Sequence, residues 1–202
     1  MYLECGPGRI RSWRNGDEEK LPVHANNRKI WLNLRDQFPH PYTPADAKRW
    51  VKHITRVTPE TSFAIEVGGE AVGGIALVLG TDVERCAAEI GYWLGEQFWG
   101  RGIATAAVIA LTDYAFTNLN LTRVFALPFA RNNGSIRVLQ KAGYTLEGCL
   151  RRSAIKDGVV LDQLMYARPT PSNFRFLITL RLATYAKSRL RLLSIFFGMR
   201  VD

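Results

Sequence analysis

Residues 97–104 read Gln97-Phe98-Trp99-Gly100-Arg101-Gly102-Ile103-Ala104 and join an alternating, strand-like segment (87–94) to an apolar, helix-like segment (103–116). A turn with two glycines at the start of a helix suits an anion, because the first backbone N–H groups of the helix have no internal partner and the helix dipole is positive there. Glycine also lets a phosphate approach the backbone closely, and Arg101 adds a positive charge. The stretch therefore predicts a site for a phosphate-bearing ligand.

Two common nucleotide-binding motifs do not fit this turn. A dinucleotide fold needs G-x-G-x-x-G and an acidic residue about 20 residues later. Only Gly100 and Gly102 are present here, and residues 117–120 contain no acid. A P-loop would continue with Gly-Lys-Ser/Thr, whereas this chain continues with Gly-Ile-Ala. Both nucleotide folds are therefore excluded.

The segments around the turn predict a mixed sheet flanked by helices. Alternating or β-branched patterns indicate strands at 9–13, 62–67, 71–79, 87–94, 122–127, 145–152 and 159–166. Helical spacing indicates helices at 17–26, 27–38, from 43 onward, 103–116 and 134–142. Gly68-Gly69 and Asp157-Gly158 are typical hairpin turns. This order of elements predicts an α/β (α+β) fold.

Four motifs in the chain resemble the GNAT N-acetyltransferase superfamily, whose pyrophosphate-binding turn has the pattern Gln/Arg-x-x-Gly-x-Gly/Ala. Besides the turn, the matching motifs are the strand before it, the second cofactor-contacting helix and the closing hairpin: 88–94, 132–144, and 147–151 with 156–158. The branch that holds the ribosomal-protein alanine acetyltransferases is the most similar. The resemblance runs from about Arg9 to Arg168. It implies a mostly antiparallel central sheet that splays between its fourth and fifth strands.

The same resemblance implies a co-substrate and a set of residues that contact it. Acetyl-coenzyme A would enter the gap between the splayed strands, with its pyrophosphate against the backbone of the glycine turn, and no metal is implied. The cofactor-binding residues carried over in this way are Trp93, Leu94, Gln97, Gly100, Arg101, Gly102, Ile103, Ala104, Asn132 and Ser135.

Acetyl transfer to an amine needs a base that takes the amine proton, and an acid helps the thiolate to leave. Glu89 is the candidate base, because strand alternation points it away from Ile90 and Tyr92. A carboxylate at the cleft would have a raised pKa through loss of hydration, which suits a base. In the alternative interpretation, Glu89 pairs with an arginine and supports the structure.

Ser135 is the candidate donor to the leaving thiolate, because in the resembling branch this serine lies near the sulfur. In the same branch, the asparagine that corresponds to Asn132 contacts the pantetheine arm. Both residues could instead only cap the helix that follows. Leu139 stands where many members carry an acid tyrosine, and Ala154 lies near the place of a glutamate in the ribosomal-protein enzymes. The acid and base roles thus pass to Ser135 and Glu89, or to water.

The composition fits one globular domain with an appendage. The chain has 202 residues, 47% of them hydrophobic and 22% charged. Its three cysteines, Cys5, Cys86 and Cys149, show no pairing pattern, so we expect a reducing compartment, with Cys86 and Cys149 as small buried residues. No apolar run reaches the roughly 18 residues of a membrane span, and no signal segment is evident. These features predict a cytoplasmic protein.

The net charge of +9 is spread unevenly. Residues 169–202 carry six basic side chains against Asp202 alone, whereas residues 1–168 hold the remaining +4. We therefore expect an acetyltransferase domain at 1–168 and a basic, apolar and helical extension at 169–202. The extension could pack on the domain, contact a second subunit in a homodimer, or bind a membrane surface, the ribosome or RNA.

The sequence favours an N-acetyltransferase that moves an acetyl group from acetyl-CoA to a primary amine by direct attack in a ternary complex. The acceptor would be a protein amino terminus or a small molecule such as a polyamine or an antibiotic. Leu139 and Ala154 prompt a second hypothesis, a catalytically silent acyl-CoA-binding sensor or scaffold. A third hypothesis is an RNA- or ribosome-associated binder that works through the basic tail.

Overall fold

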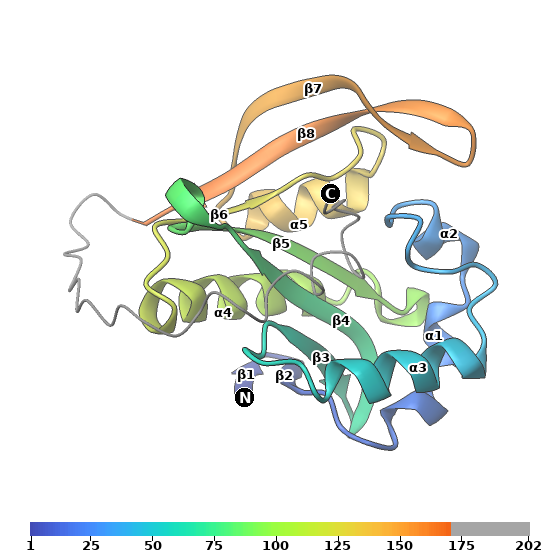
Figure 1. Ribbon diagram of the computed structural model, residues 1–202. Coiled ribbons are helices and arrows are strands. Elements are labelled where there is room, and N and C mark those ends of the chain that lie inside the picture. The colour runs from blue at the N-terminus through green and yellow to red at the C-terminus, as the bar shows by residue number, and fades with distance from the viewer. Residues whose placement is uncertain (171–202) are drawn as a thin grey trace.

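The structure of the chain is a computed structural model that describes residues 1–170. A central sheet carries helices on both faces (Figure 1). The strands are β1 Tyr2–Cys5, β2 Gly8–Ser12, β3 Ser62–Val67, β4 Glu70–Leu79, β5 Ala87–Leu94, β6 Arg123–Ala126, β7 Thr145–Lys156 and β8 Val159–Pro169. The α-helices are α1 Leu21–Ala25, α2 Arg28–Trp31, α3 Pro44–Ile54, α4 Ile103–Asn118 and α5 Asn133–Lys141.

The eight strands follow the order β1-β2-β3-β4-β5-β6-β8-β7, and every pair is antiparallel except β5 and β6. The parallel β5–β6 pairing covers only three residue pairs, from Ala87↔Arg123 to Glu89↔Phe125. On its other side β5 pairs with β4 as far as Leu94. The sheet thus parts between β5 and β6 beyond Glu89. The predicted α/β fold and the splay of its sheet are confirmed. The sheet has one strand more than predicted, because β1 lies before the first predicted strand.

Two hydrophobic clusters occupy the two faces of the sheet. The larger cluster packs α4 and α5 on one face, and the smaller packs α1 and α3 on the other. Because successive strand residues point to opposite faces, neighbouring residues of β5 are divided between the clusters. Ile90 belongs to the cluster under α4, whereas Trp93 belongs to the cluster under α3. The strand that borders the gap is therefore anchored from both sides.

Helix α3 begins where its sequence signal predicts. Thr43 Oγ1 accepts a hydrogen bond from the Asp46 N–H at 3.2 Å, and the Asp46 carboxylate accepts one from the Thr43 N–H at 2.8 Å. Pro44 occupies the first turn, where its missing N–H costs nothing. This reciprocal cap fixes the first turn of α3, whose buried residues pack in the smaller cluster on the sheet.

Two helices were predicted to be longer than they are. The segments 17–26 and 27–38 hold only a 3₁₀ turn, η1 Asp17–Glu19, and the short helices α1 and α2. Asn27 starts a new helix by accepting a hydrogen bond from the Lys29 N–H. After α2 the backbone continues as a loop, because side chains there are committed to distant partners, Arg35 to Glu89 and Asp36 to Lys156.

The closing hairpin is longer than its sequence pattern suggested, since β7 continues past residue 152. The register shifts between Leu150 and Ala154, and Arg152 has a φ of 54°, so a bulge lets the strand continue. The cysteine expectation was also wrong: Cys86 and Cys149 are exposed, whereas Cys5 is buried. Burial raises the pKa of the Cys5 thiol to about 11.

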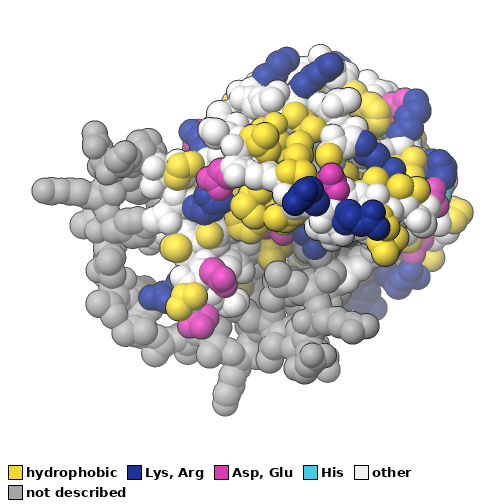
Figure 2. All heavy atoms as spheres, turned by 90° about the horizontal axis from the view of Figure 1, so that it is seen from above, with side chains coloured by type: hydrophobic (Ala, Val, Ile, Leu, Met, Phe, Trp, Pro, Cys, Tyr) yellow, Lys and Arg dark blue, Asp and Glu magenta, His cyan; other side chains and the backbone are white. Residues whose placement is uncertain are grey.

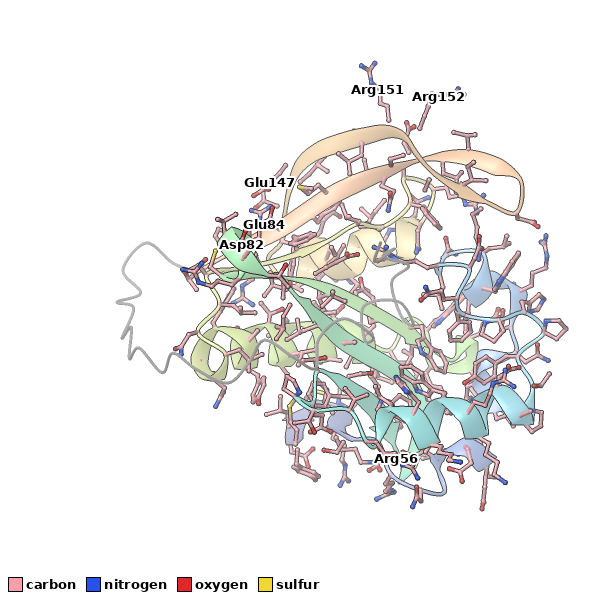
Figure 3. The ribbon with its side chains drawn as sticks, in the orientation of Figure 1. Arg56, Asp82, Glu84, Glu147, Arg151 and Arg152 are labelled. Carbon is pink, nitrogen blue, oxygen red and sulfur yellow. The ribbon has the colours of Figure 1, made fainter. Side chains whose placement is uncertain are left out.

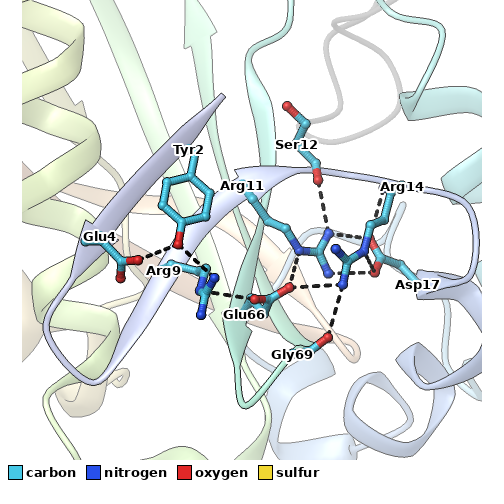
Figure 4. A network of polar contacts seen from close by, with 9 residues as sticks. All are labelled: Tyr2, Glu4, Arg9, Arg11, Ser12, Arg14, Asp17, Glu66 and Gly69. Carbon is cyan, nitrogen blue, oxygen red and sulfur yellow. Dashed lines mark hydrogen bonds and ion pairs between the residues drawn. The ribbon is translucent and has the colours of Figure 1, made fainter.

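A buried ionic network fixes the start of the chain to the sheet (Figure 4). The Arg11 guanidinium donates to both oxygens of Asp17 at 2.7 Å and also to Glu66. Arg9 and Arg14 reach the same Glu66 carboxylate at 3.1 and 3.2 Å. The network therefore connects β2, η1 and β3, with enough partners to offset the cost of burying the charges.

The predicted helical extension lies outside the described residues, apart from its first two. The contacts proposed for it with a second subunit, a membrane, the ribosome or RNA stay predictions. Within residues 1–170, no helix is long and apolar enough to cross a membrane.

Candidate active site

The glycine turn forms an open cradle at the start of α4. Gly100 and Gly102 have φ values of 74° and 78°, a left-handed conformation that favours glycine, and a Cβ added to either would meet no atom within 4 Å. Gly102 is the N-cap residue of α4 and provides no side-chain cap. The first N–H groups of a 16-residue helix therefore point at an accessible space, the geometry expected for a bound diphosphate.

A single cavity of about 1560 Å³ connects this cradle with the gap between β5 and β6. It extends from α3 and the loop after α2 on one side to α5 on the other. The predicted site residues that line it are Glu89, Trp93, Leu94, Gly100, Gly102, Ile103, Ala104, Asn132 and Ser135. Residues 38, 39 and 42, from the loop before α3, line it as well, together with Gln163 of the closing hairpin.

Two predicted cofactor residues have side chains outside the cavity lining. The Gln97 amide nitrogen lies 3.4 Å from Nδ1 of His24, and the Arg101 guanidinium lies over the Phe98 ring, 5.5 Å from its centroid. The contribution of these two positions to the site would come through the backbone of the turn, and through the charge of Arg101.

Glu89 lies at the last residue pair before the strands part, and its side chain is 12% exposed. Its two carboxylate oxygens lie 2.7 and 3.0 Å from Nη2 of Arg35, which comes from the loop after α2. Burial raises the pKa of Glu89, although the Arg35 charge and hydrogen bonds act in the opposite direction. The residue thus combines the cleft position expected of a base with the arginine partner of the alternative interpretation.

Ser135 and Asn132 lie together at the start of α5. The Asn132 side-chain oxygen accepts a hydrogen bond from the Ser135 N–H at 3.1 Å, so Asn132 is the N-cap. This leaves the Ser135 hydroxyl directed at Tyr92, whose hydroxyl lies 2.8 Å from Ser135 Oγ. Burial raises the pKa of Tyr92, so its phenol stays protonated and can donate a hydrogen bond at neutral pH.

Tyr92 and Arg35 were missed as site residues by the sequence reasoning. Strand alternation placed Tyr92 on the face opposite Glu89, but nothing in the sequence places α5 beside it. The Arg35–Glu89 pair joins residues 54 positions apart, and no local pattern marks such a pair. Tyr92 and Arg35 can be assigned to the site only from the tertiary structure.

The tip of the β7–β8 hairpin is tied to α2 and the loop after it. Lys156 is buried, with its Nζ 2.7 Å from an Asp36 oxygen and 3.8 Å from the centroid of the Trp31 ring. Arg28 pairs with Asp157 at 2.5 Å. These contacts hold the hairpin across one end of the cleft, with Arg151 and Arg152 pointing away from the sheet (Figure 3).

The residues fit coenzyme A in three respects. The glycine cradle leaves room for a diphosphate, and β5 beyond Glu89 has no strand partner toward β6 for residues 90–94. Its amide and carbonyl groups on that side could pair with the amides of a pantetheine arm, apart from the Leu94 carbonyl, which accepts a hydrogen bond from Trp99 Nε1 at 2.7 Å. Asn132 and Ser135 then line the cavity on the far side of the gap. Among residues 1–170, no cluster of three or more His, Cys, Asp or Glu side chains is placed to hold a metal ion.

Comparisons with known proteins agree with this geometry. Residues 9–145 match the acetyltransferase (GNAT) domain. Probable N-acetyltransferase YjcK of Bacillus subtilis is 43% identical, over 77% of this chain and 90% of its own length. Spermidine N(1)-acetyltransferase of Escherichia coli is 31% identical, over 59% and 68% of the two chains. With another relative, p20 of Bacillus licheniformis, the alignment spans about half of that protein's length, 48%.

Solved structures show the same fold. RimJ of Mycobacterium smegmatis, in complex with a CoA-disulfide, superimposes with a TM-score of 0.73 at 25% identity, covering 84% of this chain and 86% of its own. The enzyme class expected from the sequence, an acetyl-CoA-dependent N-acetyltransferase, is confirmed by these matches together with the curated relatives. The domain match and the likeness to YjcK extend over most of the chain, and on that evidence the chain belongs to the GNAT acetyltransferase family.

Proposed function

We propose that this acetyltransferase moves an acetyl group from acetyl-CoA to a primary amine by direct attack, with both substrates bound in the one cavity. The observation that carries the proposal is the parting of β5 from β6 beyond Glu89. It opens a passage from the glycine cradle to a buried carboxylate on one face of the sheet and to a serine hydroxyl at α5. Cofactor and acceptor would therefore meet in the gap.

Acetyl-CoA supplies the acetyl group as a thioester. The Glu89 carboxylate would accept the amine proton, because it is the only carboxylate that lines the cavity at the edge of the gap among the described residues. Burial raises its pKa, while the charge and hydrogen bonds of Arg35 act in the opposite direction and favour the ionised form that a base needs. The Ser135 hydroxyl would donate a hydrogen bond to the sulfur, which leaves as a thiolate, and the Tyr92 hydroxyl, 2.8 Å from Ser135 Oγ, would orient that serine.

A Glu89→Gln substitution tests the base. Glutamine keeps the shape and one oxygen that accepts from Arg35, but it carries no charge and cannot take a proton, so turnover should fall roughly 10²–10⁴-fold. Turnover is measured as the release of free thiol from acetyl-CoA in the presence of a panel of amines. Cys86 and Cys149 are exposed and would react with a thiol reagent, so both are replaced by serine in the assay protein.

A Glu84→Gln variant is the matched control, because Glu84 is exposed and does not line the cavity. It should keep full activity. Near-normal turnover in Glu89→Gln would move the base to another group or to a water relay.

The silent-binder hypothesis has one observation in its favour. Leu139, which stands at the place of the acid tyrosine in many relatives, is fully buried in the core. If the protein were a silent binder, coenzyme A would stabilise it against heat, while no amine would be acetylated. A single acetylated amine in the panel, with release of thiol dependent on Glu89, rejects it.

A further inference from the structure

The charged side chains that line the cavity are mostly basic. Eight are lysines or arginines and two are carboxylates: Lys29, Arg35, Arg49, Lys52, Arg56, Arg131, Arg137 and Lys141 against Asp46 and Glu89. A cavity lined by one sign of charge attracts ligands of the opposite sign. Coenzyme A carries phosphates, so part of this positive charge serves the cofactor. The positions of the basic side chains indicate which part remains for the acceptor.

The two carboxylates are already paired. Glu89 lies against Arg35, and Asp46 pairs with Arg49 while it caps α3. An acceptor with several ammonium groups, such as a polyamine, needs further acidic side chains to hold the groups that do not react. Within the described lining no third carboxylate is present. The acceptor side of the cavity is therefore poorly suited to a polycation.

Seven of the eight basic residues fall into two groups, and the eighth, Arg131, lies before α5 and donates a hydrogen bond to the Leu32 carbonyl at 2.9 Å. Arg137 and Lys141 belong to α5, near the serine and asparagine assigned to the cofactor. The second group comes from α2, the loop after it, α3 and the residues just beyond: Lys29, Arg35, Arg49, Lys52 and Arg56. The two groups cover opposite faces of the sheet, since α4 and α5 pack on one face and α1 and α3 on the other.

Within the second group, three residues form a stripe along α3. Arg49 and Lys52 are spaced i and i+3 and share one face of α3, while Arg56, which lines the same cavity, lies in the turn just beyond the end of the helix at Ile54. At the rise of a helix, the seven positions from Arg49 to Arg56 span about 10 Å, the length of about three residues of extended peptide. Lys52 and Arg56 form no ion pair with a carboxylate of residues 1–170. Arg56 marks the end of the stripe, just beyond α3 (Figure 3).

We propose that the acceptor is the amino terminus of a polypeptide with acidic side chains among its first several residues. This rests on the proposed acetyltransferase function. The amine would lie at Glu89, the first side chains against the aromatic wall of Phe38, Trp50 and Trp93, and the acidic side chains along the α3 stripe. Opposite charges along a cleft give specificity as well as faster binding.

The test compares eight-residue peptides that share the same first two residues and carry Asp, Gln or Lys at positions three to five, with spermidine as a further acceptor. We expect kcat/KM for the acidic peptide to exceed that of the neutral peptide about 10-fold, and that of the basic peptide by more. The preference should shrink in high salt, because the stripe is exposed. Equal values for the three peptides, or a preference for spermidine, would overturn the proposal.

A charge reversal, Lys52→Glu with Arg56→Glu, should lower the kcat/KM of the acidic peptide about 10-fold or more and raise that of the basic one. Lys48→Glu is the matched control, since Lys48 is exposed on the same helix and does not line the cavity. It should leave the ratio of the two peptides unchanged. A shift in Lys48→Glu in proportion to its smaller change of net charge, −2 against −4 in the double reversal, would mean that only the overall charge matters, which contradicts a specific stripe.

Failure of the proposed function is separable from failure of this inference. If no amine releases thiol, calorimetry with the CoA-loaded protein still measures the binding of the acidic and basic peptides. Tighter binding of the acidic peptide, lost in the double reversal and kept in Lys48→Glu, supports the stripe without any turnover. Equal binding of both peptides would contradict the proposed role of the stripe.

Discussion

At the scale of single residues, two opposing influences act on Glu89. Burial raises its pKa, whereas the charge and hydrogen bonds of Arg35 lower it. A base works only when it is deprotonated, so activity is lost as the pH falls through this pKa. Because the net shift is upward, the acidic limb of the kcat/KM profile should lie above the ordinary glutamate pKa of about 4.3.

An Arg35→Gln substitution should move this limb further. Removing the cation removes the influence that lowers the pKa of Glu89, so the pKa rises and the acidic limb shifts to higher pH. The pH dependence of kcat/KM measures the shift directly. An unchanged limb, or one at lower pH, would show that the titration belongs to a different group.

Ser135 and Tyr92 are tested by Ser135→Ala and Tyr92→Phe. The first removes the proposed donor and should lower turnover about 10²-fold or more. The second keeps the buried ring but removes the hydroxyl 2.8 Å from Ser135, so its effect should be smaller and in the same direction. Calorimetric affinity for coenzyme A should remain within a few-fold in Tyr92→Phe, and a large loss there would indicate a role in binding instead.

At the scale of elements, the turn before α4 depends on glycine for two separable reasons. A Gly102→Ala substitution places a Cβ at a left-handed φ of 78°, with an expected loss of stability of about 1–2 kcal/mol. The same Cβ enters the cradle and should weaken coenzyme A binding. Calorimetry measures the affinity, and urea unfolding measures the stability.

Gly69→Ala provides the matched control for the turn. Gly69 also has a positive φ, 87°, with no atom within 4 Å of an added Cβ, but it lies in the β3–β4 hairpin away from the cavity. It should lose similar stability and keep its affinity for coenzyme A. Equal affinity in both variants would remove the cradle as the diphosphate site.

The buried network around Glu66 gives the other prediction for an element. A Glu66→Ala change leaves Arg11 buried and without one of its two carboxylates, so the free energy of unfolding should fall by about 3–5 kcal/mol. Glu84→Ala, at an exposed position, should change it by less than about 0.5 kcal/mol. Urea unfolding followed by circular dichroism measures both, and equal effects would contradict a structural role for the network.

The sequence predicts elements well where the signal is local. The strands 62–67 and 87–94 and the Thr43 cap are found where their patterns placed them. The strand β1 was missed because four residues at the chain start carry too little pattern. The length of the helices near residues 17–38 and the partner of Glu89 depend on side chains more than 50 positions away, and no window along the chain contains that information.

At the scale of the whole molecule, a ligand in the gap would contact both parts of the sheet, whose strands pair across the gap through only three parallel residue pairs. Binding at 100 times the dissociation constant adds about 2.7 kcal/mol to stability, which for a domain of this size corresponds to about 5–10 °C in Tm. A thermal scan with increasing coenzyme A measures it. No shift at millimolar coenzyme A would contradict the site.

The outer face of the β7–β8 hairpin is the most apolar surface of the described residues in this view of the molecule (Figure 2). Its exposed residues include Leu146, Leu150, Ile155, Val159 and Val160, and β7 is the last strand of the sheet. A long apolar edge strand is a template for aggregation, which proteins suppress with bulges and charged residues. We expect the bulge at Arg152 and the two outward arginines, 151 and 152, to act as such gatekeepers. Replacing Arg151 with threonine and Arg152 with asparagine, which tolerates the φ of 54° at that position, should leave the fold intact and make concentrated protein precipitate.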